Sequence, residues 1–239
     1  RALREEVHAL TRAAQAVLRP QVDVVVPARL ERRFTLRTNE GFVERFAAPL
    51  AALAAREAPG VQLRFAPKPE KDAAPLREGL VDLEIGVLGA FAPEVRTQLL
   101  RRDRFVGAVR TGHPLLDAPI TPERYAACRH IVASRKGAFE GPVDAALAPL
   151  GLSRRVAVVV PAFADALRIA RRSDLVGLVP ETSLTADTAD GLVSFPLPVA
   201  TPAIAISMLW HPRLDADPEH RWLRETVQRV CREAEGERL

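Results

Sequence analysis

The stretch from residue 33 to residue 50 constrains the fold more than any other part of the chain. Residues 34–37 have the pattern of a short strand, a polar turn follows, and apolar residues then recur at helical spacing. The apolar positions on this helix face are Phe42, Phe46, Leu50 and Leu53. Strand, turn and helix in this order predict half of a β-α-β unit. In open α/β sheets, small molecules bind beyond the carboxyl ends of such strands.

Thr38 and Asn39 stand where this strand ends and the helix begins. Their side chains can cap the free N–H groups of the helix, while other N–H groups of the first turn point outward toward a ligand. For Thr38, a plain helix cap that contacts no ligand is an equally good interpretation. The turn is therefore a candidate binding element and not an established one.

The same alternation of strands and helices continues along the chain. Further strands are predicted within residues 58–65, 81–86, 104–110, 130–133, 155–160, 175–179 and 204–210, and helices within 75–79, 122–127, 141–150, 162–172 and 217–235. Strands that alternate with helices imply a parallel sheet. The second series mirrors the first, so we expect an α/β fold of two Rossmann-like lobes around a cleft, which suits a small-molecule sensor.

The N-terminal segment has a different pattern. Its apolar residues follow the spacing of a coiled-coil seam, at Leu3, Val7, Leu10, Ala14 and Val17. Fewer than three heptads do not make a stable isolated helix, so this segment needs a partner helix or a longer continuation. A helix packed on its own domain remains the alternative. Pro20 ends the pattern, and residues 21–29 are predicted to be a linker.

Composition excludes several protein classes. With 48% hydrophobic and 27% charged residues, the chain of 239 residues is that of an ordinary folded protein. The net charge of +4 comes from basic residues interleaved with acids, which favours a solvated surface over a nucleic-acid patch. No apolar run approaches the roughly 18 residues of a membrane span, and the first 19 residues lack an apolar signal region. Cys128 and Cys231 are far apart in sequence, which favours packing roles in a reducing, cytoplasmic compartment.

Several motifs together indicate a family. They are LREGLVDLEIG at residues 76–86, RDRFVGAVRTGHPL at 102–115 and DLVGLVP at 174–180. In this order and spacing they resemble the effector-binding domain of LysR-type transcriptional regulators. The segment WHPRLDADPEHRWLR at 210–224 resembles the end of the nodulation-type subgroup. Residues 171–174, Arg-Arg-Ser-Asp, depart from the family by replacing its usual Gly-rich turn.

The resemblance implies the type-II periplasmic-binding-protein fold, with two lobes joined by two crossover strands and preceded by a linker helix. The expected division is a linker or dimerisation helix at 1–20, a first lobe at 30–105 and 208–239, and a second lobe at 106–207. The implied partners are a small-molecule effector and further copies of the chain, in a homodimer or tetramer. DNA would be contacted only through a winged helix-turn-helix, which nothing in this sequence matches, and no membrane contact is expected.

The resemblance also places the effector between the lobes, at turns that follow strands. The predicted binding residues are Thr38, Asn39, Leu88, Ser134, Arg135 and Phe163. Ser134 and Arg135 could instead close a solvent-exposed turn, and Phe163 could be a core residue rather than an aromatic wall of the cleft. Leu88 enters only because the backbone from residue 86 to 88 should run near the cleft.

No pattern indicates catalysis. The five histidines lack the spacing of metal ligands, and no nucleophile elbow, phosphate loop or dinucleotide fingerprint is present. Asp82 and Glu84 share one face of a strand and could imitate an acid/base pair, but the family pattern accounts for the aspartate. We therefore expect no enzyme, no cofactor and no metal. The alternative function is a solute-binding protein of a transport system with the same fold.

Overall fold

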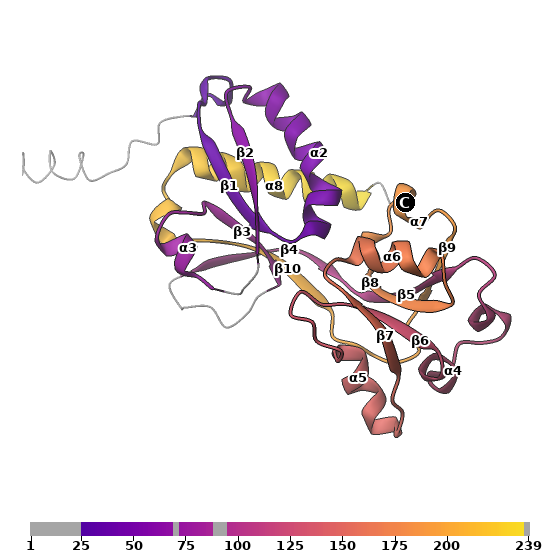
Figure 1. The fold of residues 1–239 in the computed structure, drawn as a ribbon. Helices are drawn as coiled ribbons and strands as arrows, with labels where there is room; N and C mark the ends of the chain where they lie inside the picture. The colour runs from indigo at the N-terminus through magenta and orange to yellow at the C-terminus, as the bar shows by residue number, and fades with distance from the viewer. Residues whose placement is uncertain (1–24, 69–71, 88–94, 237–239) are drawn as a thin grey trace, which may run out of the picture.

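The computed structural model describes residues 25–68, 72–87 and 95–236. The predicted N-terminal helix and Leu88 lie outside these residues. Within them the chain forms two five-stranded sheets. Figure 1 shows the two sheets side by side, each with its own helices.

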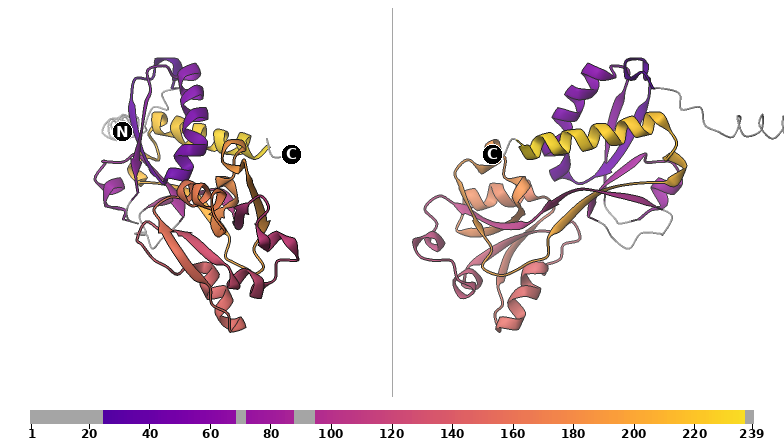
Figure 2. Two further views of the ribbon diagram at one scale, coloured as in Figure 1. Left: turned by 45° about the vertical axis from the view of Figure 1, so that its right-hand side comes forward. Right: turned by 180° about the vertical axis from the view of Figure 1, so that it is seen from behind.

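The first sheet has the order β2-β1-β3-β10-β4. Its strands are β1 (Arg33–Thr38), β2 (Gln62–Pro67), β3 (Leu83–Val87), β4 (Arg96–Asp103) and β10 (Ile204–Trp210). Its helices are α2 (Glu40–Glu57), α3 (Ala74–Arg77) and α8 (Pro218–Gly236), with the 3-10 turns η1 (Pro27–Arg29) and η5 (Pro212–Leu214). α2 and α8 pack together over one face of this sheet, as the rear view in Figure 2 shows.

The second sheet has the order β7-β6-β8-β5-β9. Its strands are β5 (Phe105–Arg110), β6 (Arg129–Ala133), β7 (Arg155–Val160), β8 (Leu175–Pro180) and β9 (Leu192–Pro196). Its helices are α4 (Pro122–Ala127), α5 (Pro142–Leu147), α6 (Phe163–Arg171) and α7 (Ala186–Ala189), with η2 (Pro114–Asp117), η3 (Ala148–Leu150) and η4 (Glu181–Ser183). Each sheet thus carries helices of its own, as the two-lobe prediction requires.

The sheets contain the predicted parallel strands, but each is mixed rather than entirely parallel. β1 is parallel to β2 and β3, and β6 is parallel to β7 and β8, but β10 runs antiparallel to β3 and β4, and β5 runs antiparallel to β8 and β9. The antiparallel strands are those next to the two connections between the sheets. Because these connections do not return through a crossover helix, they do not impose the parallel direction. β4, β9 and α7 were not predicted.

Each sheet is buried on both faces. In the first lobe, Phe34, Met208 and Trp222 belong to the core under α2 and α8, whereas Leu209 packs with Leu76 of α3 on the opposite face. In the second lobe, one apolar cluster lies under α6 and another under α4 and α5. The face of α2 that was predicted from spacing is buried, including Phe42, Phe46, Leu50 and Leu53.

The turn at residues 171–174 needs no glycine. The Ser173 hydroxyl donates to the carbonyl of Ile169 at 2.8 Å and accepts from the N–H of Leu175 at 3.3 Å. The described residues include no non-glycine residue with positive φ. A serine side chain therefore closes the turn for which the family uses glycine.

Candidate functional site

The turn after β1 has two different polar residues. Asn39 caps α2, because its side-chain oxygen accepts a hydrogen bond from the N–H of Phe42 at 3.0 Å. Thr38 does not cap the helix. Its side chain is buried, with the residue 2% exposed, and its hydroxyl finds no hydrogen-bond partner among the described residues. A buried hydroxyl without a partner costs free energy, so Thr38 is a candidate for contact with a ligand.

Thr38 lies in the wall of a cleft of about 440 Å³. Both sheets contribute to the lining. From the first lobe come the end of β1, the first turn of α2 and parts of β3 and β10, and from the second lobe come the ends of β6 and β8 and the start of α6. A concave site of this size is typical of small-molecule binding.

Most of the cleft wall is apolar. Four phenylalanines line it, two from α2 and one each from the start of β5 and of α6, namely Phe42, Phe46, Phe105 and Phe163. The rings of Phe105 and Phe163 lie 6.5 Å apart in a tilted arrangement. Aromatic rings around a cleft favour ligands with a flat apolar body.

A few polar groups interrupt this wall. The helices α2 and α6 both begin at the cleft, and no side chain caps α6. Free N–H groups at a helix N-terminus favour hydrogen-bond acceptors or negative charge. Arg135 and Glu40 also line the cleft, as do Asp103 and Thr182 near the connection between the sheets.

A buried ion cluster supports the wall from behind. The guanidinium of Arg37, next to Thr38, donates from Nε to Glu84 Oε2 at 2.7 Å, and the ammonium of Lys68 is 2.5 Å from Glu84 Oε1. All three residues are almost fully buried, and Gly86 in the cleft wall lies directly over the Lys68 ammonium. Asp82 and Glu84, the two carboxylates that could imitate an acid/base pair, therefore both have structural roles. Glu84 binds the two cations, and Asp82 accepts a hydrogen bond from the N–H of Thr35 at 2.8 Å.

The predicted residues of the second lobe behave differently from one another. Arg135 and Phe163 line the cleft. Ser134 does not, because its N–H donates to the carbonyl of Val160 and its hydroxyl accepts from the N–H of Ala138 at 2.9 Å. Ser134 therefore closes a turn, which is the alternative interpretation given for it above.

A family model identified as "LysR substrate binding domain" matches residues 27–232. The chain belongs to this family. Among curated relatives, the HTH-type transcriptional activator NagR of a Ralstonia species is 29% identical over 214 residues, which are 87% of this chain and 70% of NagR. The HTH-type transcriptional activator NahR of Pseudomonas putida is 30% identical over 203 residues, 84% of this chain and 68% of NahR.

Solved LysR-type structures have the same fold. A probable transcriptional regulator from Pseudomonas aeruginosa, PA0477, superposes with a TM-score of 0.74 at 27% identity, covering 94% of this chain and 74% of that chain. A putative transcriptional regulator from Vibrio parahaemolyticus gives 0.75 at 25% identity, covering 89% and 99%. The chain is thus the regulatory domain of a LysR-type transcriptional regulator, and this assignment is favoured over a transport solute-binding protein.

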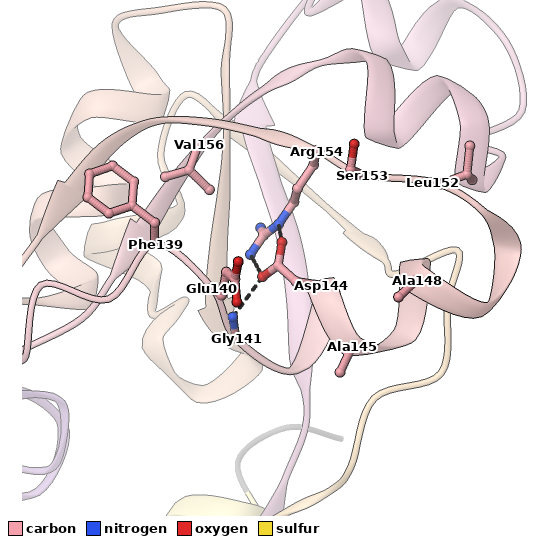
Figure 3. Close-up of a pocket in the computed structure, with 10 residues that line it drawn as sticks. All are labelled: Phe139, Glu140, Gly141, Asp144, Ala145, Ala148, Leu152, Ser153, Arg154 and Val156. Atoms are coloured by element: carbon pink, nitrogen blue, oxygen red, sulfur yellow. Dashed lines mark hydrogen bonds and ion pairs between the residues drawn. The ribbon is translucent and has the colours of Figure 1, made fainter.

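A second hollow lies on the second lobe of the protein, away from the cleft. It has a volume of about 540 Å³ and is bordered by α5 and the start of β7 (Figure 3). Arg154 and Asp144 form a bidentate ion pair at its floor, with distances of 2.9 and 2.8 Å. The Arg154 side chain has no exposed surface. The pair satisfies the Asp144 carboxylate, whereas Arg154 Nη1 has no hydrogen-bond partner among the described residues.

Behind that ion pair lies a buried aromatic pair, Tyr125 and His130, with ring centroids 4.6 Å apart. Burial lowers the pKa of His130 to about 4, and the positive charge of Arg154 acts in the same direction. Burial raises the pKa of Tyr125 to about 12. Both groups are therefore neutral at pH 7.

Over residues 25–68, 72–87 and 95–236, no three or more His, Cys, Asp and Glu side chains are grouped so that they could hold a metal ion. In the same ranges, no helix is both long enough and apolar enough to cross a bilayer. The Cys128 thiol donates to the carbonyl of Arg124 at 3.4 Å, and Cys231 is buried in the core of the first lobe.

Several of the cleft residues discussed above were not predicted from the sequence, among them Phe105, Asp103 and Thr182. Asp103 and Phe105 flank the point where the chain passes from one sheet to the other. The motif RDRF contains them, and the boundary between the lobes was predicted between residues 105 and 106, but without β4 neither side chain could be assigned to the cleft wall. No local pattern marks Thr182, which reaches the cleft only because η4 follows β8.

Proposed function

We propose that the cleft binds a small-molecule effector and that the effector controls DNA binding by the full-length regulator. The observation that carries this proposal is the wall shared by both lobes, in which the buried Thr38 hydroxyl has no partner among the described residues. An effector that contacts both lobes favours one lobe arrangement, and it can shift the equilibrium only by its difference in affinity between arrangements. No catalytic step is part of this proposal.

The units that move are the two lobes, residues 30–105 with 208–239, and residues 106–207. DNA would be bound through a winged helix-turn-helix ahead of residue 1, in the cytoplasm. NagR and NahR are named HTH-type transcriptional activators, which supports this arrangement for the longer protein.

Self-association is proposed to run through the N-terminal segment, in a homodimer or tetramer. Leu10 occupies the coiled-coil seam of that segment. Leu10→Asp should therefore lower the mass of the particle in light scattering. An unchanged mass would count against the seam as a contact between copies.

The test of the cleft uses two glycines that lie in the two hollows. A Cβ at Gly41 in the cleft, or at Gly141 in the hollow beside α5, would meet no heavy atom within 4 Å. Gly41→Phe and Gly141→Phe thus place matched rings in the two sites. A library of small metabolites is screened by thermal shift on the wild type and both variants, because a bound ligand raises the melting temperature.

We expect hits that stabilise the wild type and Gly141→Phe but not Gly41→Phe. Hits that respond to Gly141→Phe instead would move the effector site to the hollow on the second lobe. Hits unaffected by either variant would remove both sites.

A further inference from the structure

One polar group in the cleft wall stands out because it is a carboxylate in apolar surroundings. Asp103, the last residue of β4, is 7% exposed. Its neighbour across the ladder is Ile204, and Phe105, Pro180 and Ile204 line the cleft with it. Burial of a carboxylate costs several kcal/mol unless donors satisfy it, so the donors of Asp103 decide how the group is used.

Two donors are present. The N–H of Arg104 donates to Oδ1 at 2.8 Å, and the Thr182 hydroxyl donates to Oδ2. A carboxylate has about four acceptor positions, so capacity remains on a group that borders the cleft. Thr182 also lines the cleft, and it comes from the other lobe.

The surroundings hold Asp103 and Thr182 in place. Arg104 and Glu181, their chain neighbours, form a bidentate ion pair at 3.1 and 2.6 Å, and the N–H of Glu181 donates to the carbonyl of Arg104. Phe105 and Pro180 are paired in the ladder of β5 and β8. The acceptor is therefore positioned by backbone pairing and by one ion pair between its chain neighbours, which is how a specific binding group is preorganised.

We infer that Asp103 determines the specificity of the cleft: it accepts a hydrogen bond from a donor group of the effector, such as a hydroxyl group, and rejects a carboxylate at that position. The apolar body of the ligand lies against the phenylalanines. This inference rests on the proposed function of the cleft. Its physical basis is that like charges in a half-buried site repel strongly, whereas a donor meets an acceptor already in place.

The test compares two probes of similar size and shape, benzyl alcohol and benzoate, by calorimetry on the full protein. Asp103→Asn removes the negative charge and keeps an acceptor oxygen. It should shift the ratio of the two dissociation constants toward benzoate by about tenfold, which is the order expected for one unit charge several ångströms away in such a site. Asp117→Asn, an exposed aspartate in η2 outside the cleft, makes the same change in net charge and should leave the ratio unchanged.

Thr182→Val is the second variant. It removes the hydroxyl that shares Asp103 while retaining the side-chain shape, so the carboxylate should accept more readily from benzyl alcohol. Binding of benzyl alcohol should strengthen by a few-fold, with no comparable gain for benzoate.

A purely structural role for Asp103 predicts a different result. In that case Asp103→Asn lowers the melting temperature and weakens both probes equally, and the unchanged ratio overturns the inference. Gly41→Phe separates this failure from failure of the proposed function. If Gly41→Phe abolishes probe binding but Asp103→Asn leaves the ratio of the two dissociation constants unchanged, only the inference about Asp103 fails. If Gly41→Phe has no effect on probe binding, the probes bind outside the cleft and both proposals fail. If neither probe binds the wild type, the inference about Asp103 fails, and the thermal-shift screen still decides the proposed function.

Discussion

The turns after β1 and β6 occupy equivalent places in the two lobes, yet they use their polar residues differently. After β1, Asn39 caps a long helix at once, which leaves the Thr38 hydroxyl buried at the cleft. After β6, the Ser134 hydroxyl is used within its own turn, and the next helix begins only at Pro142. A hydroxyl at the end of a strand is therefore available to a ligand only where another group performs the local capping.

The contrast extends to the groups behind the two turns. In the first lobe, Glu84 is fully buried between the cations Arg37 and Lys68. In the second lobe, Arg154 is the fully covered partner, and its Asp144 remains about one fifth exposed. In the first lobe one fully buried carboxylate thus compensates two cations, whereas in the second lobe a partly exposed carboxylate compensates one buried cation.

Glu84→Gln tests this difference and should have the largest effect. Removal of one partner of a buried ion pair leaves uncompensated charge, which costs about 3 to 5 kcal/mol of unfolding free energy. Asp144→Asn, the matched change in the second lobe, should cost less because it removes the carboxylate from one buried cation, Arg154, whereas Glu84→Gln removes it from two. Urea denaturation of both variants measures the difference. Equal losses would show that the two lobes are supported alike.

Acid should act on the second lobe through His130. Its pKa is lowered to about 4 by burial, below the usual 6.5, so the unfolded chain binds a proton that the folded chain does not. Stability should therefore fall as the pH drops from about 6.5 to 4, by up to about 3 kcal/mol from this group. In His130→Gln the dependence of the unfolding free energy on pH should be weaker over this range. An unchanged slope would assign the acid sensitivity to other groups, such as His220, whose pKa burial also lowers.

Thr38→Ala and Ser134→Ala compare the two hydroxyls directly. Loss of the Thr38 hydroxyl should weaken a ligand identified by the thermal-shift screen by about tenfold, the usual order for one hydrogen bond to a buried group. The melting temperature should hardly change, because no described partner is lost. Ser134→Ala should leave the dissociation constant as it is. A ligand that responds to Ser134→Ala and ignores Thr38→Ala would reverse the comparison.

Asn39→Ala should have the smallest effect of the series. Loss of an N-cap costs about 1 kcal/mol of unfolding free energy, and α2 is long and packed against α8, so the fold should persist. The result is measured by thermal unfolding, with Thr121→Ala at the N-terminus of α4 as the matched cap in the second lobe. A loss of several kcal/mol at Asn39 would mean that this side chain does more than cap the helix.

The sequence was sufficient for the elements that have a strong local pattern. The buried face of α2 follows from the spacing of Phe42, Phe46 and Leu50, and the capping role of Asn39 follows from its position before a helix. β4 was missed because its first four residues are exposed and two arginines interrupt its apolar pattern. β9 was missed because it is short and ends at a proline, and such a segment gives little strand signal.

The site was harder to predict because it depends on distant contacts. Thr38 and Phe163 were predicted and line the cleft, but only the folded chain brings Asp103 and Thr182 together, 79 residues apart. Nothing near Ser134 in the sequence shows that Ala138 will occupy its hydroxyl. Such competition between local and ligand hydrogen bonds is decided by backbone geometry, which a residue pattern does not contain.

The two links between the sheets differ greatly in length. A lone residue, Arg104, separates β4 from β5, whereas residues 197–203 join β9 to β10. A one-residue link cannot change its length, so it fixes a point about which the lobes can rotate. The seven-residue link can change its end-to-end distance and so permits the rotation. Rotation of one lobe relative to the other should therefore occur about a hinge close to Arg104. The backbone torsions at Arg104 would limit the amplitude of this rotation, and a proline at position 104 would make the hinge more rigid.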